Sequence, residues 1–406
     1  MSGGLGPLRV GTFRPAPPLR QRLAARRRVC YTGGMKNDVF FVRCDDYGPA
    51  LSEALDRLFD LTGWLARRDL SGKRVLLKPN LLTDRTPEQA VTTHPELVRQ
   101  IIRRFKAAGA QVSVGDSPAS TANLQRVWEA SGIGAVCAAE QVPLISFEQV
   151  GAQAFEREGF AFSIARPVLD ADLIVNLPKV KSHSLTMLTA AVKNIYGAVP
   201  GYSKTTLHRL HPKPDSFGRL IKTIWQVIPP SWTIADGVVG MEGQGPANGR
   251  PVKLGFLAAA EDPFALDRAL CVTLHIDTRR VPYLAAQEAA CQTPPAVAGD
   301  RVSVEAFDIP SGAHLLRLVP DWLVRRAGRI VWVRPAFSGT ACVQCGQCVR
   351  ACPVHALSLS AGAPCPVLDS TRCISCSCCH EICPQDAIRM TQSRILRLLK
   401  VFKGID

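Results

Sequence analysis

Ten of the chain's fifteen cysteines lie between Cys342 and Cys383, and eight of these form two runs of identical spacing. Each run reads C-x2-C-x2-C-x3-C-P. Three thiolates at positions i, i+3 and i+6 let one tight loop reach three iron corners of a 4Fe-4S cubane, and the fourth corner needs a cysteine from elsewhere. The pattern therefore predicts two 4Fe-4S clusters, which exchange electrons one at a time. The runs are Cys342, Cys345, Cys348 and Cys352, and Cys373, Cys376, Cys379 and Cys383.

Zinc is the alternative occupant, because sets of four cysteines also bind zinc tetrahedrally. Zinc sites usually pair two C-x2-C knuckles, which explains neither the third evenly spaced cysteine nor the Cys-Pro step. Cys365 and Cys378 lie outside both runs, and Cys378 directly precedes Cys379. A register shifted by one residue at Cys378 therefore stays open.

The duplicated run resembles the two-cluster bacterial ferredoxins, in which the fourth cysteine of each run binds the other cluster. This resemblance implies a small α+β ferredoxin-like domain over residues 338–392. It also implies crossed ligand sets. One cluster would be held by Cys342, Cys345, Cys348 and Cys383, and the other by Cys373, Cys376, Cys379 and Cys352.

The elements upstream of the cysteines must position any substrate. From Lys36 to about Pro310, apolar runs of strand length alternate with stretches of helical period. This alternation predicts an α/β domain with a largely parallel sheet. The expected strands are Arg74–Lys78, Gln111–Gly115, Leu173–Leu177, Thr233–Ala235 and Leu254–Ala259, and the expected helices are Pro95–Ala108 and Leu124–Ala130.

Two polar segments follow strands of this predicted sheet, at the edge where open α/β sheets bind ligands. The first runs from Lys179 to Lys193, and the second is a glycine-rich loop from Asp236 to Glu242. A third loop, Gly115-Asp116-Ser117, could bind an anion through its backbone or simply cap a helix. We expect the first two segments to form one functional cleft.

The residue types in this expected cleft suit a small anion such as a carboxylate or phosphate. The predicted substrate-binding residues are Lys179, Lys181 and Glu242, and the predicted catalytic residues are His183, Lys193 and Asp236. His183 is the candidate proton donor, since histidine titrates near neutral pH, with Asp236 orienting it. A structural histidine bonded to the glycine-rich loop is the alternative interpretation of His183.

The sequence contains no G-x-G-x-x-G, P-loop, G-x-S-x-G or H-E-x-x-H motif. Several segments instead resemble the bacterial and archaeal family known as the domain of unknown function numbered 362, over about residues 36–310. They are Lys78-Pro79-Asn80, Thr93-His94-Pro95, Gly115-Asp116-Ser117, Pro178-Lys179-Val180-Lys181-Ser182-His183, Lys193-Asn194 and Asp236 to Gly243. With an appended ferredoxin module, the chain is similar to members described as iron–sulfur cluster-binding proteins. The resemblance implies no particular activity.

The formal net charge of +15 comes partly from residues 1–34, which hold seven arginines and no acid. Because the sequence has no nucleic-acid motif or aromatic-interleaved basic stripe, we do not expect a nucleic-acid partner. We interpret residues 1–35 as a basic, disordered leader or a misassigned start, with Met35 as the true start.

Clustered cysteines of metal-ligand spacing favour a reducing cytoplasm over a disulfide scaffold.

The remaining segments bear on partners. No apolar run is long enough for a transmembrane helix. Residues 311–337 are expected to be a linker, and residues 393–406 a basic amphipathic tail helix that docks on the protein or contacts a membrane surface. Two functions follow as hypotheses. The chain is either a 4Fe-4S-dependent oxidoreductase acting on a small anionic substrate, or a non-catalytic electron carrier or assembly factor that docks a redox partner protein.

Overall fold

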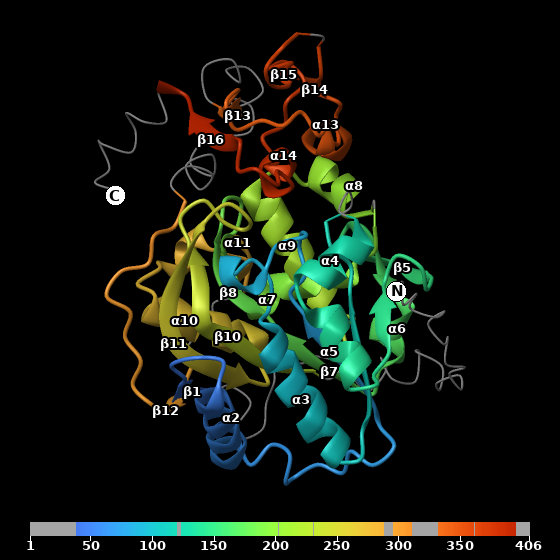
Figure 1. Cartoon of the computed structure of the whole chain (residues 1–406), viewed down its shortest axis with the longest axis vertical. Helices are drawn as coiled ribbons and strands as arrows, with labels where there is room; N and C mark the ends of the chain where they lie inside the picture. Colours follow the sequence, from blue (N-terminus) through green and yellow to red (C-terminus); the bar gives the residue numbers. More distant parts are fainter. Residues whose placement is uncertain are drawn as a thin grey trace, which may run out of the picture.

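The computed structural model describes residues 38–119, 123–201, 203–229, 231–287, 295–310, 332–360 and 362–394. The predicted leader, most of the predicted linker and all but the first two residues of the predicted tail helix lie outside these residues. Figure 1 shows an α/β large domain and, packed across one end of it, a smaller C-terminal module in orange and red.

One mixed sheet organises the large domain. Its spatial order is β12 (Val297–Gly299), β1 (Val39–Arg43), β11 (Arg250–Ala260), β10 (Ser231–Glu242), β7 (Leu173–Leu177), β2 (Arg74–Pro79), β3 (Gln111–Asp116) and β4 (Leu144–Ser146). The pairs from β10 through β4 are parallel, whereas β11 runs antiparallel to both β10 and β1. Two further strands, β8 (Lys179–His183) and β9 (Met187–Thr189), extend from the outer part of β10. The predicted α/β class with a largely parallel sheet is therefore confirmed.

The central strands bury side chains on both faces, as a sheet covered by two helical layers requires. In β2, Val75 and Leu77 belong to one hydrophobic core, while Leu76 belongs to the other. The first core is completed by α2 (Pro49–Thr62), α3 (Pro95–Ala107), α4 (Leu124–Ala130) and α5 (Ile133–Ala139). The second core is completed by α6 (Arg166–Asp170), α7 (Ala191–Asn194), α8 (Ser203–Leu210), α9 (Pro214–Trp225), α10 (Pro263–Thr273) and α11 (Pro282–Ala285).

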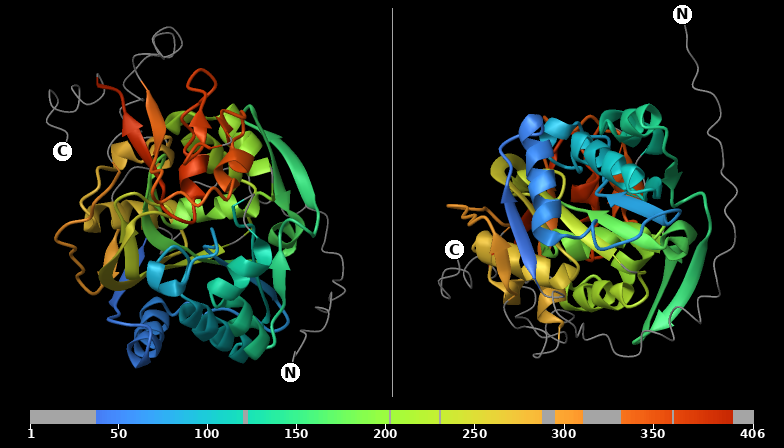
Figure 2. Two further views of the ribbon diagram at one scale, coloured as in Figure 1. Left: turned by 45° about the horizontal axis from the view of Figure 1, so that its top comes forward. Right: turned by 90° about the horizontal axis from the view of Figure 1, so that it is seen from below.

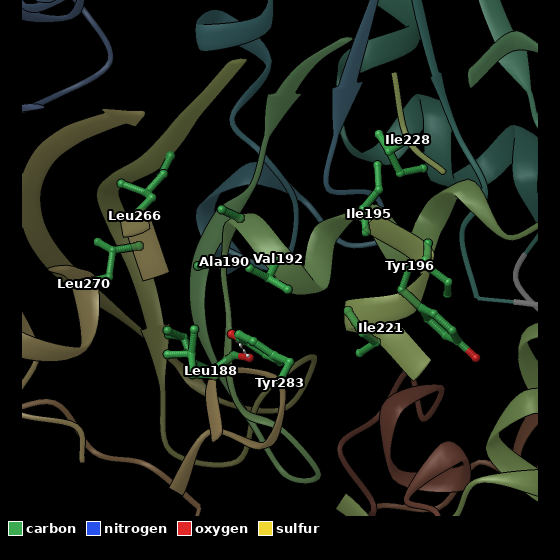
Figure 3. Packing of buried hydrophobic residues seen from close by; sticks show 14 of the residues in the cluster. Leu188, Ala190, Val192, Ile195, Tyr196, Ile221, Ile228, Leu266, Leu270 and Tyr283 are labelled. Atoms are coloured by element: carbon green, nitrogen blue, oxygen red, sulfur yellow. Dashed lines mark hydrogen bonds between the residues drawn. The ribbon is translucent and has the colours of Figure 1, made fainter. Parts of the chain in front are cut away.

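The apolar side chains of the short helix α7 are buried in the second core. Figure 3 shows Val192 of α7 and Ile195 of the following turn η2 (Ile195–Ala198) among buried apolar side chains. In the same view the Tyr283 hydroxyl donates to the Leu188 carbonyl at 3.2 Å, which ties α11 to β9. This packing fixes α7, and with it the polar residues Lys193 and Asn194.

The segment Asp236–Glu242 differs from the predicted glycine-rich loop, because it continues β10 as a paired strand. Gly237 pairs with Phe256 of β11, and Gly240 pairs with Val252. A Cβ atom on Gly237 would lie 2.4 Å from the Phe256 ring, so only glycine fits there. These glycines permit close packing between strands rather than the approach of a ligand.

The C-terminal module contains a duplicated loop and helix. Helices α13 (Gln347–Ala351) and α14 (Cys378–Glu381) occupy equivalent places in the two repeats, and each follows a residue in the left-handed region, Gly346 or Ser377. Strand β13 (Val333–Phe337) pairs with β16 (Ile388–Gln392), and β14 (Leu357–Ser358) pairs with β15 (Val367–Leu368). Since β13 belongs to the module's own sheet, the segment expected to end the linker is part of this module.

Candidate functional site

Two cavities in the C-terminal module are each lined by four cysteines. Cys342, Cys345, Cys348 and Cys383 line the first, and Cys352, Cys373, Cys376 and Cys379 line the second. We name them the outer and the inner cysteine cavity. Each takes three cysteines from one repeat and the fourth from the other, which is the crossed grouping implied by the resemblance to two-cluster ferredoxins.

The donor set in these cavities fits 4Fe-4S clusters. Backbone N–H groups point at the sulfurs, as cluster thiolates require: Ala356 donates to Sγ of Cys352 at 3.2 Å, and Ala387 donates to Sγ of Cys383 at 3.3 Å. Among the described residues, no three His, Cys, Asp or Glu side chains converge tightly enough to hold a single metal ion. Three cysteines from one repeat with a fourth from the other form the ligand arrangement of a 4Fe-4S cubane in two-cluster ferredoxins.

Cys378 does not line either cysteine cavity. It lines a third cavity instead, at the junction of the large domain and the module, together with Glu381 of the same helix α14. We call this space of about 100 Å³ the junction cavity. The shifted register considered from the sequence is therefore not favoured by the geometry.

The junction is held by side chains of the large domain that bind the module's backbone. Arg85 donates to the Cys383 carbonyl at 3.0 Å and pairs with Asp386 at 2.7 Å. The amide of Asn248 donates to the His380 carbonyl at 3.0 Å. The left view of Figure 2 shows the red module lying against green segments of the large domain, where α8 and α9 are found.

A buried ion pair lies at the sheet edge of the junction cavity. Lys78, at the end of β2, and Asp116, at the end of β3, are 2.8 Å apart and each only 1% exposed. Asp116 also accepts from the backbone N–H groups of Leu81 and Ser117. A Cβ atom on Gly197 would lie 2.1 Å from the Asp116 carboxylate, so glycine is required where η2 passes over this pair.

Three further lysines line the junction cavity. Lys181 donates to the Val91 carbonyl at 2.7 Å, and Lys204 donates to the Ser117 hydroxyl at 2.8 Å and to the Pro118 carbonyl at 2.7 Å. The ammonium group of Lys193 lies 4.8 Å from the centre of the Tyr196 ring. Burial lowers the pKa of Lys181 and Lys193, and lowers that of Lys204 to about 7. An anion in the cavity would restore the charged form of each amine.

His183 is held in one tautomer. Its Nδ1 accepts from the backbone N–H groups of Leu185 at 3.0 Å and Thr186 at 3.3 Å, so the neutral ring carries its proton on Nε2. Nε2 lies 3.5 Å from Oε1 of Glu381. Burial lowers the pKa of His183 well below its usual value, and the Lys193 charge adds to this. Burial raises the pKa of Glu381 to about 7, against the effect of Lys193 and Lys181.

The structure brings together only part of the predicted cleft. Lys181, His183 and Lys193 line the junction cavity, but Lys179, Asp236 and Glu242 do not. Asp236 pairs with Lys179 at 2.6 Å and accepts from the Tyr47 hydroxyl at 2.7 Å. Glu242 binds Arg250 at 2.8 Å and the Asp308 backbone. Backbone groups, rather than Asp236, therefore orient His183, and the Lys179–Asp236 pair stabilises the large domain.

Sequence reasoning did not place five lining residues in the expected cleft, although the Gly115-Asp116-Ser117 loop was considered as a possible anion site. They are Lys78, Asp116, Lys204, Cys378 and Glu381. A signal for the first two was present, because Lys78 and Asp116 both fall where neighbouring predicted strands end. Lys204 lies beyond the polar segment Lys179–Lys193 and has no motif around it. Cys378 and Glu381 reach the cavity only because the module docks on the large domain, and spacing along the chain does not encode that contact.

A family described as a domain of unknown function (DUF362) matches residues 75–272. The thylakoid-associated protein sll1697 of Synechocystis sp. is 35% identical over 257 residues, which are 63% of this chain and 79% of that protein. The chain belongs to the DUF362 family. In this DUF362 protein a 4Fe-4S dicluster domain matches residues 341–387, which confirms the expected ferredoxin-type module. Such a module has an iron–sulfur electron-transfer role and implies a redox partner.

Two solved structures show weak likeness to this DUF362 protein, each at 14% identity over 58% of the chain. One is the lactate racemase apoprotein from Thermoanaerobacterium thermosaccharolyticum, with a TM-score of 0.38 and 56% of that chain covered. The other is a protein from Thermotoga maritima, with a TM-score of 0.37 and 61% covered. The match thus spans less than two thirds of either chain, and no chemistry is inferred from it. None of the described helices has the length and apolar character needed to cross a membrane.

Proposed function

We propose that this DUF362 protein holds two 4Fe-4S clusters, one in each cysteine cavity, and passes electrons to a small anionic substrate in the junction cavity. The observation that carries the proposal is the shared lining of that cavity. Lys181 and Lys193 come from the large domain, while Cys378 and Glu381 come from the module that carries the cysteines. The same cavity therefore contains lysines that could bind an anion and residues of the helix next to a proposed cluster site.

The inner cysteine cavity is the proposed electron donor to the substrate. Cys379 and Cys352 line that cavity, and the residues that precede them in the sequence, Cys378 and Ala351, line the junction cavity. When bound, the clusters would supply single electrons. The outer cavity includes the exposed Cys345 and lies beside Val343, which is 61% exposed, so we assign the redox partner's docking to that side.

The lysines would bind and orient the anion, and their charge would favour negative charge developing on the substrate. His183 would act as a neutral hydrogen-bond donor through Nε2 rather than as an imidazolium acid, because its pKa is far below neutrality. This revises the role expected for His183 from its residue type. We propose neither the predicted catalytic role of Asp236 nor the predicted substrate binding by Lys179 and Glu242, since none of the three lines the junction cavity.

A reducing cytoplasm suits this function, since cluster ligands are thiolates rather than disulfides. The Synechocystis relative is named for its thylakoid association. We therefore propose a cytoplasmic protein whose predicted basic tail could make a peripheral membrane contact. Flotation with anionic vesicles, comparing the full chain with one ending at Arg394, tests the membrane contact.

Anaerobic isolation followed by stopped-flow spectroscopy tests the function. Iron and acid-labile sulfide are first quantified, and zinc in their place would overturn the cluster assignment. The reduced protein is then mixed with candidate small anions while cluster absorbance is followed. Lys193→Ala should slow anion-driven reoxidation, whereas Lys253→Ala, an exposed lysine on β11, should not. Equal rates in both variants and the wild type would exclude the junction cavity as the active site.

A further inference from the structure

We infer that the ligand of the junction cavity is a small oxyanion that also carries a hydroxyl or amino group, and that Glu381 recognises this hydrogen-bond donor. The inference rests on the proposed function, because it concerns the same cavity. It adds the chemical class of the ligand and a specificity role for the C-terminal module.

Four residues that line the cavity each carry a buried side-chain atom with no hydrogen-bond partner among the described residues. These atoms are Oδ1 of Asn80, Oγ1 of Thr189, Nδ1 of His208 and Oε1 of Glu381. Thr189 and His208 are only 3% and 5% exposed. Because buried polar atoms normally have partners, such a group of unpartnered atoms around one cavity indicates a ligand that supplies them.

The oxygens of Asn80 and Glu381 accept hydrogen bonds, so the cavity requires more than a simple anion. A bare oxyanion would satisfy the ammonium groups of Lys181 and Lys193 but would leave both acceptors unsatisfied. The negative charge of a bare oxyanion would also be repelled by the Glu381 carboxylate, which lines the same cavity. A ligand with an anionic group at one end and a donor at the other satisfies both sets.

The duplicated module provides an internal comparison for Glu381. Glu381 is the fourth residue of α14, and Arg350 is the fourth residue of the equivalent helix α13. Arg350 is exposed and donates to the Cys345 carbonyl at 3.2 Å. The local fold therefore does not require an acid at this position. The acid occurs in the repeat that faces the large domain. Its Oε1 lies 3.5 Å from Nε2 of His183, which is longer than an ordinary N–H···O hydrogen bond, so Oε1 stays without a partner.

The size of the cavity limits the ligand. Its volume is about 100 Å³. For comparison, an engineered protein cavity of about 150 Å³ holds one benzene molecule. By that scale the ligand has about four or five non-hydrogen atoms. Acetate, glycolate and glycine fall in this range and differ in the donor, which makes them suitable probes.

Calorimetric titration of the cluster-loaded protein under anaerobic conditions tests the inference. Glycolate or glycine should bind about tenfold more tightly than acetate, the effect of about one added hydrogen bond to a charged group. Glu381→Ala should abolish this difference while acetate still binds, and Arg350→Ala should preserve it. Lys193→Ala should weaken all probes alike. Equal affinities in the wild type, no binding of any probe, or a preference that survives in Glu381→Ala would overturn the inference.

A second variant covers the case in which Glu381→Ala does not load its clusters. Glu381→Gln keeps an acceptor oxygen but loses the negative charge, so it should retain the preference for glycolate and lose that for glycine. Stopped-flow mixing of the reduced protein with the same probes and a wider set of small anions separates the two proposals. A donor preference without reoxidation by any anion would remove the proposed electron transfer alone. Reoxidation without a donor preference would remove this inference alone.

Discussion

Nε2 of His183 lies 3.5 Å from Oε1 of Glu381, so the end of strand β8 faces helix α14 across the domain junction. Backbone donors occupy Nδ1 of His183, which leaves Nε2 as the protonated nitrogen. The cavity between the two domains therefore has a fixed hydrogen-bond donor on one wall and an acid on the other.

This arrangement predicts that His183 does not titrate during turnover. Its pKa lies well below 6.5, so the ring is neutral throughout pH 6–8, and its own protonation produces no inflection there. His183→Ala should lower the affinity for the activating anion by about tenfold, the loss of about one hydrogen bond, at every pH in that range. Reoxidation rates measured against anion concentration test this. A loss that grows toward acid pH would instead show that the imidazolium is the active form.

The buried lysines predict the pH dependence of anion binding. Burial lowers the pKa of Lys204 to about 7, and an anion favours the ammonium form, so binding takes up protons. The affinity should therefore fall as pH rises above about 7. Calorimetric enthalpies in buffers of different ionisation heat report the proton uptake directly. Proton release, or an affinity that does not change between pH 6 and 9, would contradict the prediction.

The Cys378 thiol should be dispensable for metal content. Cys378→Ser should keep the iron and sulfide of the wild type, because Cys378 lines the junction cavity, whereas Cys379→Ser should lose the contents of the inner cysteine cavity. Cys365→Ser should likewise keep the iron and sulfide content of the wild type. Iron and sulfide analysis of anaerobic preparations tests this prediction. Loss of iron in Cys378→Ser would show that Cys378 is a cluster ligand.

The Lys78–Asp116 pair should contribute strongly to stability. Asp116→Asn leaves the buried Lys78 ammonium without its counter-charge, and breaking such a pair costs about 3 kcal/mol of unfolding free energy. Asp172→Asn is the control, since the Arg74–Asp172 pair is partly exposed and should contribute about 1 kcal/mol or less. Urea unfolding midpoints give the comparison. Equal shifts of the unfolding midpoint in the two variants would mean that Lys78 becomes neutral in Asp116→Asn with little loss of stability.

The docking contacts of Arg85 predict a local effect on the junction. Arg85→Ala should keep both clusters but raise amide hydrogen exchange in residues 378–383 by about tenfold, the loss of about one charged hydrogen bond. Arg99→Ala is the control, because Arg99 forms its ion pairs with Glu96 and Glu140, both inside the large domain. Unchanged exchange in Arg85→Ala would show that apolar packing alone holds the module.

The sequence was most informative where covalent spacing dictates geometry. The cysteine spacing predicted the ferredoxin-type module, and apolar periodicity predicted Leu173–Leu177 and Leu124–Ala130 with their observed bounds. It misled at Asp236, because glycines that allow β10 and β11 to pack closely also resemble a ligand-binding loop. The contact of Glu381 with His183 could not be predicted, since it depends on how two separately folded units dock.

The crossed cysteine cavities also bear on how the module could have evolved. Removing the second repeat would take three cysteines from the inner cavity and one from the outer, so both would lose their function. Neither copy of the ancestral segment could then be discarded or exchanged alone. The two repeats differ at positions outside the predicted ligand sets, such as Gln347 against Cys378 and Arg350 against Glu381. Duplication thus left one helix free to become part of a binding site while its twin kept its surface role.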